Sequence, residues 1–472
     1  MGPLPSLQEA SRHAQLVIGY IVGYMKKGKA TFWIICIVAI LIAILIGVYL
    51  LVFSFGTQNA KSGSNLQIES NPEFFVVPQT SSERQISSFD AAIDGTDNIY
   101  VFWVDFDNMV RYTYKEAGGS SWSAIAQLPD RGKDVRILPA NDGLHAIVVG
   151  VYSLGIHSVK HYLSKNQGKT WEPMPAIIES DNFIAECDAT ATNEAIYVAC
   201  LMGEPSTEDV LELKMVRIDS NGISSISTVA GNVTKSGAIP PSIEFFGDEL
   251  HVLWADNIGL TNTKSAMRYA KSADGGKTWT TSLDILSIKD GRKSVSDEVV
   301  QYQYIVSATV VATQKRIYAL YASSAPWISF SSDGKDWPAP ISVSPYSQGS
   351  WGDASIKMVS TPECDSVIWI DGRFEKRDIN IGLPWSDADP SWHNNDILTA
   401  CLPENIDGLL KDKLEWKRIT PKFSYSDELK ALQSGSKTYV FWSGVERVSK
   451  ASKENLPEKI SEEGSNIFYA VI

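Results

Sequence analysis

Basic residues are scarce for a chain of this length. The 472 residues include 42 lysines and arginines against 55 aspartates and glutamates, and only six histidines. The first 56 residues hold one acidic and four basic side chains, which leaves 54 acidic against 38 basic residues, a net charge of −16, in the remainder. Because binding to a phosphate backbone requires a basic surface, this balance argues against nucleic acid as a partner.

Charged residues are missing altogether from Phe32–Phe55, a run of 24 residues rich in Ile, Leu and Val. A helix of this length reaches about 36 Å, enough to cross a hydrocarbon core of about 30 Å. Four basic residues precede the run and only Lys61 closely follows it, so the positive-inside rule places the N-terminus in the cytoplasm. We therefore expect a single-pass protein of the cell membrane, with a cytoplasmic segment (1–30), a transmembrane anchor (31–56), a linker (57–72) and an extracytoplasmic domain (73–472).

Cysteine is rare, with five in the chain, of which Cys36 falls within the expected anchor. Cys187 and Cys200 are equidistant from a predicted hairpin turn, so they could face each other on neighbouring strands. Cys364 and Cys401 would be the remaining pair. Four cysteines in an extracytoplasmic domain fit two disulfides, although they allow three pairings, and buried free thiols are the alternative.

Familiar catalytic motifs are also absent: the chain has no Walker loop, no HExxH motif and no Ser/His/Asp nucleophile motif. His157 and His161 would share one face of a strand, but two histidines alone are a weak metal signal, and packing explains them as well. Asn232–Thr234 is a single N-glycosylation sequon, whose meaning depends on the source.

What the sequence does contain is a repeated strand rich in aromatic and β-branched residues and bounded by Gly, Asp and Asn. Seven copies can be aligned, about 45 to 73 residues apart. They are Asp97–Trp103, Asp142–Val148, Asn193–Cys200, Asp248–Trp254, Lys315–Tyr321, Cys364–Trp369 and Ser436–Trp442.

Each copy lies inside a longer unit of four strands, which predicts an all-β, seven-bladed β-propeller, with six blades as the alternative. A strand of small residues precedes each copy, as the crowded axis of a propeller requires, and the tryptophans suit the wedge between blades. The last unit, ending in Ser465–Val471, lacks a fourth strand. Glu73–Val77 can supply it and close the ring.

A short turn containing Gly and Trp also recurs, at Ser164–Trp171, Ser272–Trp279 and Ser331–Trp337. Where the turn contains an Asp, its carboxylate can accept hydrogen bonds from backbone N–H groups of the same loop. Gly takes the positive φ angle, and Trp anchors the loop on the blade. These residues are expected to be structural.

These turns resemble the Asp-box (BNR) repeats of sialidases and related propellers, a likeness that covers roughly residues 73–472. The family includes enzymes, receptors and assembly factors, so the resemblance implies the fold more than the chemistry. The sialidase pattern would make Tyr425 the nucleophile, because Tyr425–Asp427 resembles the family's Tyr-Ser-Asp, and would give Arg136 and Arg373 to the substrate carboxylate.

The sequence departs from that pattern in several places. Leu138 separates Arg136–Ile137 from the proline of the family's Arg-Ile-Pro motif, and Gly150–Ser158, where the acid/base Asp is expected, contains no carboxylate. Arg373 recurs in many non-catalytic units of such propellers. We therefore favour a binding or assembly module for envelope proteins or glycans over an exo-acting glycosidase of the sialidase type.

Two sets of ligand-binding candidates remain. Acids open the first strands, so they could form a ring near one mouth of the channel that binds Ca²⁺ or a cationic group, or each could cap its own strand or a neighbouring loop; otherwise no metal or cofactor is expected. The long interruption Asp378–Leu414 could stack on a sugar or dock a protein. The candidates are Asp90, Asp134, Asp188, Asp353, Asp427, Trp385 and Trp392.

Overall fold

The described residues lie within one compact unit, Ile68–Ile472. The computed structural model describes residues 74–77, 86–151, 157–180, 183–203, 210–234, 239–258, 264–281, 283–288, 292–296, 299–302, 305, 307–322, 326–343, 355–371, 396–404, 406, 414–420, 424–446 and 466–472. The predicted anchor Phe32–Phe55, with Cys36, lies outside these residues. Within them, no helix has the length and apolar character needed to cross a membrane.

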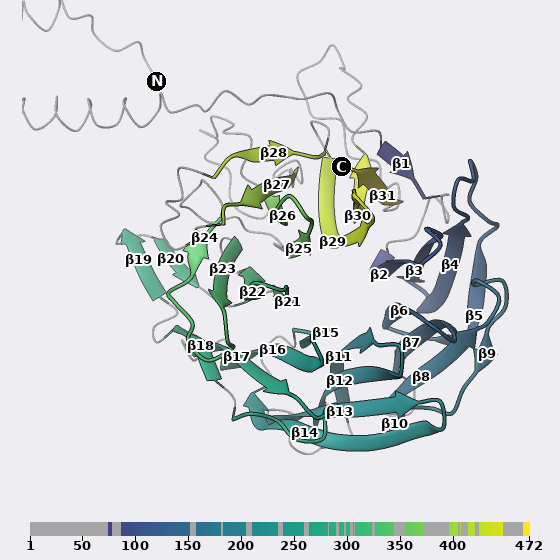
Figure 1. The fold of residues 1–472 in the computed structure, drawn as a ribbon, viewed down its shortest axis with the longest axis horizontal. Coiled ribbons are helices and arrows are strands. Elements are labelled where there is room, and N and C mark those ends of the chain that lie inside the picture. The colour runs from purple at the N-terminus through teal and green to yellow at the C-terminus, as the bar shows by residue number, and fades with distance from the viewer. Residues whose placement is uncertain are drawn as a thin grey trace, which may run out of the picture. The chain divides into compact units, whose positions relative to one another are not determined.

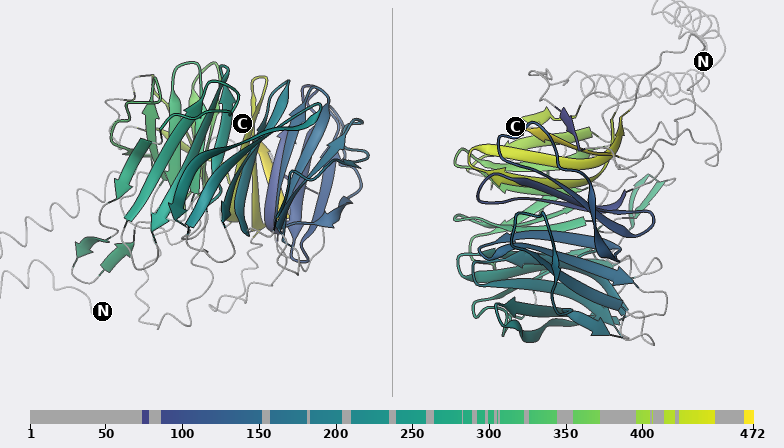
Figure 2. Two further views of the ribbon diagram at one scale, coloured as in Figure 1. Left: turned by 90° about the horizontal axis from the view of Figure 1, so that it is seen from below. Right: turned by 90° about the vertical axis from the view of Figure 1, so that its right-hand side faces the viewer.

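The described strands form seven antiparallel sheets of at least four strands, which are the blades of a seven-bladed propeller. Figure 1 shows the sheets arranged radially, with the first strand of each innermost, and in Figure 2 the strands run between the two faces of the wheel. The prediction of seven blades is confirmed, and the six-bladed alternative is wrong.

The blades follow chain order. Blade 1 contains β2 (Ile86–Ile93), β3 (Ile99–Asp105), β4 (Met109–Lys115) and β5 (Ala126–Arg131). Blade 2 contains β6 (Asp134–Ala140), β7 (Gly143–Val151), β8 (His157–Ser164), β9 (Glu172–Pro173) and β10 (Ile178–Ser180). Blade 3 contains β11 (Phe183–Ala191), β12 (Ala195–Gly203), β13 (Val210–Asp219) and β14 (Gly222–Thr234). Blade 4 contains β15 (Ser242–Phe246), β16 (Glu249–Ile258), β17 (Lys264–Ser272) and β18 (Leu283–Ile288).

A separate two-stranded sheet, β19 (Arg292–Ser296) and β20 (Val299–Tyr302), precedes blade 5. Blade 5 contains β21 (Ser307–Ala312), β22 (Ile317–Ala322), β23 (Pro326–Ser331) and β24 (Ile341–Ser342). Blade 6 contains β25 (Ile356–Ser360), β26 (Asp365–Asp371), β27 (Asp396–Leu402) and β28 (Trp416–Arg418). Blade 7 contains β29 (Ser424–Ser434), β30 (Lys437–Glu446), β31 (Asn466–Val471) and, from the other end of the domain, β1 (Phe74–Val76).

The ring is closed as the sequence predicts. Strand β1 pairs antiparallel with β31, so that Phe74 lies opposite Ala470 and Val76 opposite Phe468. The Val77 N–H also donates to the Ile467 carbonyl at 2.9 Å. Closure in this way removes one exposed sheet edge, because the C-terminal blade takes its outer strand from the N-terminal side.

The core is divided among the interfaces between blades, and the repeated tryptophans fill it. Trp103, Trp254, Trp369 and Trp442 are at most 2 % exposed. Each packs in a cluster with residues of the preceding blade, as Trp254 does with Tyr197 and Met215 of blade 3. A buried Trp removes about 150–250 Å² from water, so these residues contribute strongly to holding adjacent blades together.

The repeated turns have the predicted hydrogen bonds. Asp274 Oδ1 accepts the backbone N–H groups of Lys277 and Thr278 at 3.0 and 2.9 Å, and Ser272 Oγ accepts that of Gly276 at 2.9 Å. Gly275 and Gly276 have φ angles of 72° and 83°.

The tryptophan of each turn, however, reaches the blade before its own. Trp171 of blade 2 packs edge-on against Phe102 of blade 1, with ring centroids 5.3 Å apart. Trp337 of blade 5 likewise lies 5.2 Å from the ring of Tyr269 in blade 4. The turn therefore links neighbouring blades, in addition to connecting two strands of its own blade.

Gly334→Ala is expected to destabilise the propeller by about 1–3 kcal/mol. Gly334 has a φ of +75°, and a Cβ there would lie 2.9 Å from Tyr269 Oη of the neighbouring blade. Gly435→Ala is the matched control, because its φ is also positive (+57°) but nothing lies within 4 Å of the added carbon. Urea unfolding would measure both variants, and equal losses would show that the contact with Tyr269 is unimportant.

Both expected disulfides are formed. Cys187 and Cys200 lie directly opposite each other on β11 and β12, with their Cα atoms 4.2 Å apart. Cys364, the residue just before β26, is joined to Cys401 of β27, with Cα atoms 5.8 Å apart. The alternative of buried free thiols is wrong for these four residues.

Candidate functional site

One polar residue from each inner strand lies at the same level of the propeller. In each blade this residue lies opposite the second-to-last residue of the repeated strand found in the sequence. Asp90, for example, lies opposite Phe102, and Lys430 lies opposite Phe441. The seven residues, here called the inner ring, are Asp90, Arg136, Asp188, Ser242, Thr309, Lys357 and Lys430.

The polar character of the inner ring has a structural cause. An inner strand has a sheet partner on one side only, so the N–H and C=O groups on its other edge need acceptors and donors from elsewhere. Side chains of the neighbouring blade supply them. Asp90 Oδ2 accepts the N–H of Ile137 at 2.9 Å, and Asp188 Oδ2 accepts that of Ile243 at 3.1 Å.

The same link recurs with hydroxyl groups around the ring. Ser242 Oγ accepts the N–H of Val310 at 3.0 Å, and Thr309 Oγ1 lies 3.4 Å from the Ile356 carbonyl, to which it donates. Capping was one of the two predicted roles for the acids. Asp90 and Asp188 cap a group of the next blade, whereas Asp134 Oδ1 accepts the N–H of Val135 on its own strand at 2.8 Å, as the sequence predicts.

Arg136 is the centre of the most highly charged part of the ring. Its Nη1 atom lies 2.6 Å from Asp134 Oδ1 and its Nε atom 2.9 Å from Asp188 Oδ1. Only 14 % of the side chain is exposed. Burial alone would lower the pKa of Arg136, but the charges of Asp134, Asp188 and Asp90 outweigh it and raise the pKa further, so the guanidinium stays charged.

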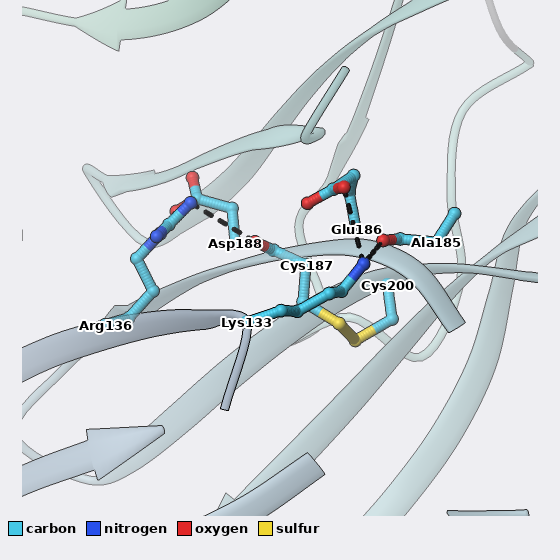
Figure 3. The surroundings of a disulfide bond; sticks show 7 residues. All are labelled: Lys133, Arg136, Ala185, Glu186, Cys187, Asp188 and Cys200. Carbon is cyan, nitrogen blue, oxygen red and sulfur yellow. Dashed lines mark hydrogen bonds and ion pairs between the residues drawn. A yellow bond between two sulfur atoms is a disulfide. The ribbon is translucent and has the colours of Figure 1, made fainter. Parts of the chain in front are cut away.

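Figure 3 shows this region beside the Cys187–Cys200 disulfide. Arg136 reaches Asp188 on one side of Cys187, and Lys133 reaches Glu186 and the Ala185 carbonyl on the other. The disulfide holds β11 against β12 between these two contacts. Blade 2 therefore binds blade 3 through two cations placed three residues apart.

A second charged contact links the last blade to the first. Lys430 Nζ lies 2.6 Å from Asp90 Oδ1, and the Asp90 side chain is 3 % exposed. Two residues earlier on β29, Glu428 Oε2 accepts the N–H of Phe89 at 3.0 Å. Burial, followed by the charge of Asp134, raises the pKa of Glu428 to about 8.

The junction between blades 6 and 7 is different, because it places two lysines side by side in the ring. Lys430 is paired with Asp90 on its other side, whereas Lys357 Nζ donates to the hydroxyl of Thr309 at 3.1 Å. Among the described residues, no ion pair joins Lys357 to a carboxylate, and no side-chain hydrogen bond joins blade 6 to blade 7 within the ring. Burial first, and then the charge of Lys430, lower the pKa of Lys357 to about 8.

Glu244 adds a further unusual carboxyl, two residues beyond Ser242 on β15. Burial, and secondarily the charge of Asp188, raise its pKa to about 8. The inner wall therefore contains carboxyl groups that hold a proton near neutral pH and an ammonium group that releases one easily. Such titrating groups are frequent at functional sites, although structural charge networks also produce them.

Three of the predicted ligand-binding acids come together here, but not in one layer. Asp90 and Asp188 belong to the inner ring, whereas Asp134 lies two residues before the ring position of β6 and accepts a hydrogen bond from Ser88 at 2.5 Å. All three are engaged by Arg136, Lys430 or backbone N–H groups.

The remaining candidates cannot be placed as side chains. Tyr425 and Asp427 lie on β29, where Tyr425 pairs with Val445, but their side chains are outside the described part of the chain. Asp353, Arg373, Trp385 and Trp392 fall outside the described residues entirely. The described residues contain no group of three or more His, Cys, Asp or Glu that could hold a metal ion. Calcium binding that involves Asp353 or Asp427 stays a prediction.

Sequence reasoning missed the two lysines, the ring hydroxyls and both high-pKa glutamates. The signal that would have found the ring was available, because the second-strand repeat fixes which first-strand residue lies opposite it. The first-strand residue that lies opposite the second-to-last residue of the repeat is polar in every blade.

The histidines form a separate buried group within blade 2. His145 Nδ1 and His161 Nε2 are 2.8 Å apart, and His145 Nε2 lies 2.8 Å from Asp142 Oδ1. Burial, with the charge of His145 second, lowers the pKa of His161 to about 4. The packing explanation given for His157 and His161 agrees with their burial, and the pair His145 and His161 lies within the blade, apart from the inner ring.

The sequence matches no protein-family profile and no curated protein. Among solved structures, the chain is similar to an α-L-arabinofuranosidase from Fusarium graminearum (13 % identity, TM-score 0.44, covering 86 % of this chain and 97 % of the other). It is also similar to a sialidase from Trypanosoma rangeli, with 13 % identity and a TM-score of 0.43, covering 84 % of this chain and 59 % of the other. A third similar structure is a lectin from Burkholderia pseudomallei, with 14 % identity and a TM-score of 0.48, covering 76 % of this chain and 93 % of the other. Because all three TM-scores are below 0.5, the functional proposal depends on the inner ring itself.

Proposed function

We propose that the protein is a membrane-anchored, extracytoplasmic binding propeller that holds a carboxylate-bearing ligand at the inner ring, between blades 6 and 7. The observation that carries this proposal is the adjacent pair Lys357 and Lys430, at the junction where no side-chain hydrogen bond among the described residues links the two blades within the ring. Two neighbouring cations cost free energy in the folded protein, and a bound anion would offset that cost.

The ligand class follows from the chemistry of the ring. Two lysines provide point charges for one carboxylate, and the hydroxyl of Thr309 next to Lys357 can exchange its hydrogen bond with a sugar hydroxyl. The resemblance of the turns to the Asp boxes of sialidase-like propellers makes an acidic sugar the first ligand to test. A protein partner with an exposed carboxylate is the alternative.

Binding is favoured over hydrolysis because of how the arginines are used. A sialidase-type site needs three arginines converging on the substrate, but Arg136 is the only arginine on the seven described inner strands. Its guanidinium is already occupied by Asp134 and Asp188. Lysines cannot form the bidentate contacts that such a site uses.

The cellular placement is part of the same proposal. The uncharged run Phe32–Phe55 supports an anchor, and the basic residues before it support a cytoplasmic N-terminus. Two disulfides in the propeller support folding in an oxidising compartment. The anchor would keep the binding face close to ligands of the envelope.

Titration calorimetry of the full chain in detergent, with galacturonate against galactose, tests the ligand class. We expect binding of galacturonate, weakened about 10- to 100-fold by Lys357→Met, because one charge-assisted hydrogen bond contributes about 1.5–3 kcal/mol. Lys315→Met is the control, because Lys315 pairs with Glu404 at an exposed site, 71 % accessible. Equal binding of both sugars, or equal loss in both variants, would contradict the proposal.

A fluorogenic sialoside assay on the same preparation tests the alternative function. We expect no turnover, since the described inner strands provide a single, occupied arginine. Turnover abolished by Tyr425→Phe would replace the binding proposal with a sialidase-type glycosidase, whose nucleophile is that tyrosine.

A further inference from the structure

The outer edge of blade 3 is unusually long and carries no charge. Strand β14 spans 13 residues, Gly222–Thr234, without an acidic, basic, histidine or proline residue. It is the last strand of its sheet, so one row of its backbone groups has no sheet partner. Ile223 and Ile226 are 45 % and 62 % exposed along it. A long, uncharged edge of this kind is a template for pairing with another chain.

The other described outer edges have the protection that β14 lacks. Strands β1, β10 and β28 have three residues each, and β24 has two. The six-residue strand β5 contains Pro129 and two charged residues, and β18 contains Asp284. Short length, proline and charge are the usual means of preventing edge-to-edge association.

The ladder between β13 and β14 has three register shifts, and the one nearest the end of β14 lies at Asn232. Leu211 pairs with Val233 and Leu213 with Ala230, so the single residue Glu212 faces two residues of β14, Gly231 and Asn232. This is a β-bulge, which turns side chains away from the sheet. Asn232 has a φ of +57° and is exposed, whereas the next residue, Val233, is buried in the blade.

Asn232 is also the acceptor residue of Asn232–Thr234, the single Asn-x-Ser/Thr sequon in the chain. The same blade contains the Cys187–Cys200 disulfide, which forms in the kind of compartment where N-glycans are added. The sequon therefore lies on an exposed bulge of β14, the outer strand with the least protection against pairing with another chain.

We infer that Asn232 is N-glycosylated and that the glycan shields the free edge of β14 from association with other chains. This inference rests on the extracytoplasmic placement proposed above. The Asn232 amide nitrogen would displace the diphosphate of a lipid-linked oligosaccharide at its anomeric carbon. The new C–N bond replaces the C–O bond to phosphate, the amide loses one proton, and the lipid diphosphate leaves without any redox change.

The test is expression of the full chain in a eukaryotic secretory pathway, followed by peptide-N-glycosidase digestion and peptide mass mapping. We expect one glycan, on Asn232, that is lost in Asn232→Gln and Thr234→Ala but kept in Thr234→Ser. We also expect Asn232→Gln to increase the aggregated fraction measured by light scattering. Adding Ile226→Lys to that variant should reverse the increase, because it places a charge on the same edge.

A designed acceptor separates failure of this inference from failure of the placement. Ile223→Thr creates a second sequon at Asn221, an exposed residue of the turn before β14. A glycan at Asn221 with none at Asn232 would overturn the inference and leave the placement intact. No glycan at either residue, with four cysteines open to maleimide, would overturn the placement as well. A glycan on Asn232 whose removal does not change aggregation would refute the shielding role.

Discussion

Arg136→Met is expected to lower the free energy of unfolding by about 3–5 kcal/mol, as measured by urea denaturation. Methionine keeps much of the apolar stem but removes the charge that lies 2.6 Å from Asp134 and 2.9 Å from Asp188. The buried carboxylate of Asp134 and the partly buried one of Asp188 would stay close to each other without their counter-ion. Breaking a buried ion pair costs more than the pair itself contributes, because the remaining charges have lost their solvation.

Arg268→Met is the matched control for that prediction. Arg268 also bridges two aspartates, Asp256 at 3.2 Å and Asp284 at 3.0 Å, but its side chain is 29 % exposed and that of Asp284 is 55 % exposed. We expect a smaller loss there, because only Asp256, 6 % exposed, would stay buried without its cation, whereas Asp284 is largely in solvent. Asp188→Asn added to Arg136→Met should recover part of the stability, and similar losses at both arginines would show that the inner ring has no special role.

Glu428→Gln is expected to make the propeller more stable above neutral pH and to flatten its pH dependence. The pKa of Glu428 rises from an ordinary 4.5 to about 8, chiefly through burial. Between these two values the folded protein holds a proton that the unfolded chain releases. The stability that this group provides is therefore complete below about pH 4.5 and is lost as the pH rises to 8.

Glutamine retains an oxygen that can accept the N–H of Phe89 but never becomes charged. Near pH 8.5 we therefore expect the variant to exceed the wild type by about 2–4 kcal/mol, and the difference to vanish near pH 4.5. Urea midpoints measured at several pH values would show this, with Glu194→Gln at an exposed turn as the control. Parallel pH profiles for wild type and variant would contradict the prediction.

The sequence predicted the architecture well because the propeller depends on short-range patterns that recur. The second-strand tryptophans, the glycines of the turns and the missing fourth strand of the last unit each appear in a few adjacent residues. Their roles in packing, φ angle and ring closure were therefore predictable. Cys187 and Cys200 belong to the same group, since a hairpin fixes which residues face each other.

The candidate site was predicted less well because it is assembled between blades. Asp90 looked like a free acid opening a strand, yet it caps Ile137 of the next blade and pairs with Lys430 at the far end of the chain. Sequence distance concealed that contact. A charge balance such as that around Arg136 depends on which side chains meet between neighbouring blades, and the register of one blade does not reveal it.

The closure of the wheel through β1 has a mechanical consequence. Three residues, Phe74–Val76, hold the N-terminal side of the domain to β31, the last strand of the chain. Any tension applied through residues before Phe74 therefore acts first on the short pairing of β1 with β31. In a chain tethered from its N-terminal side, these three residue pairs would bear the force.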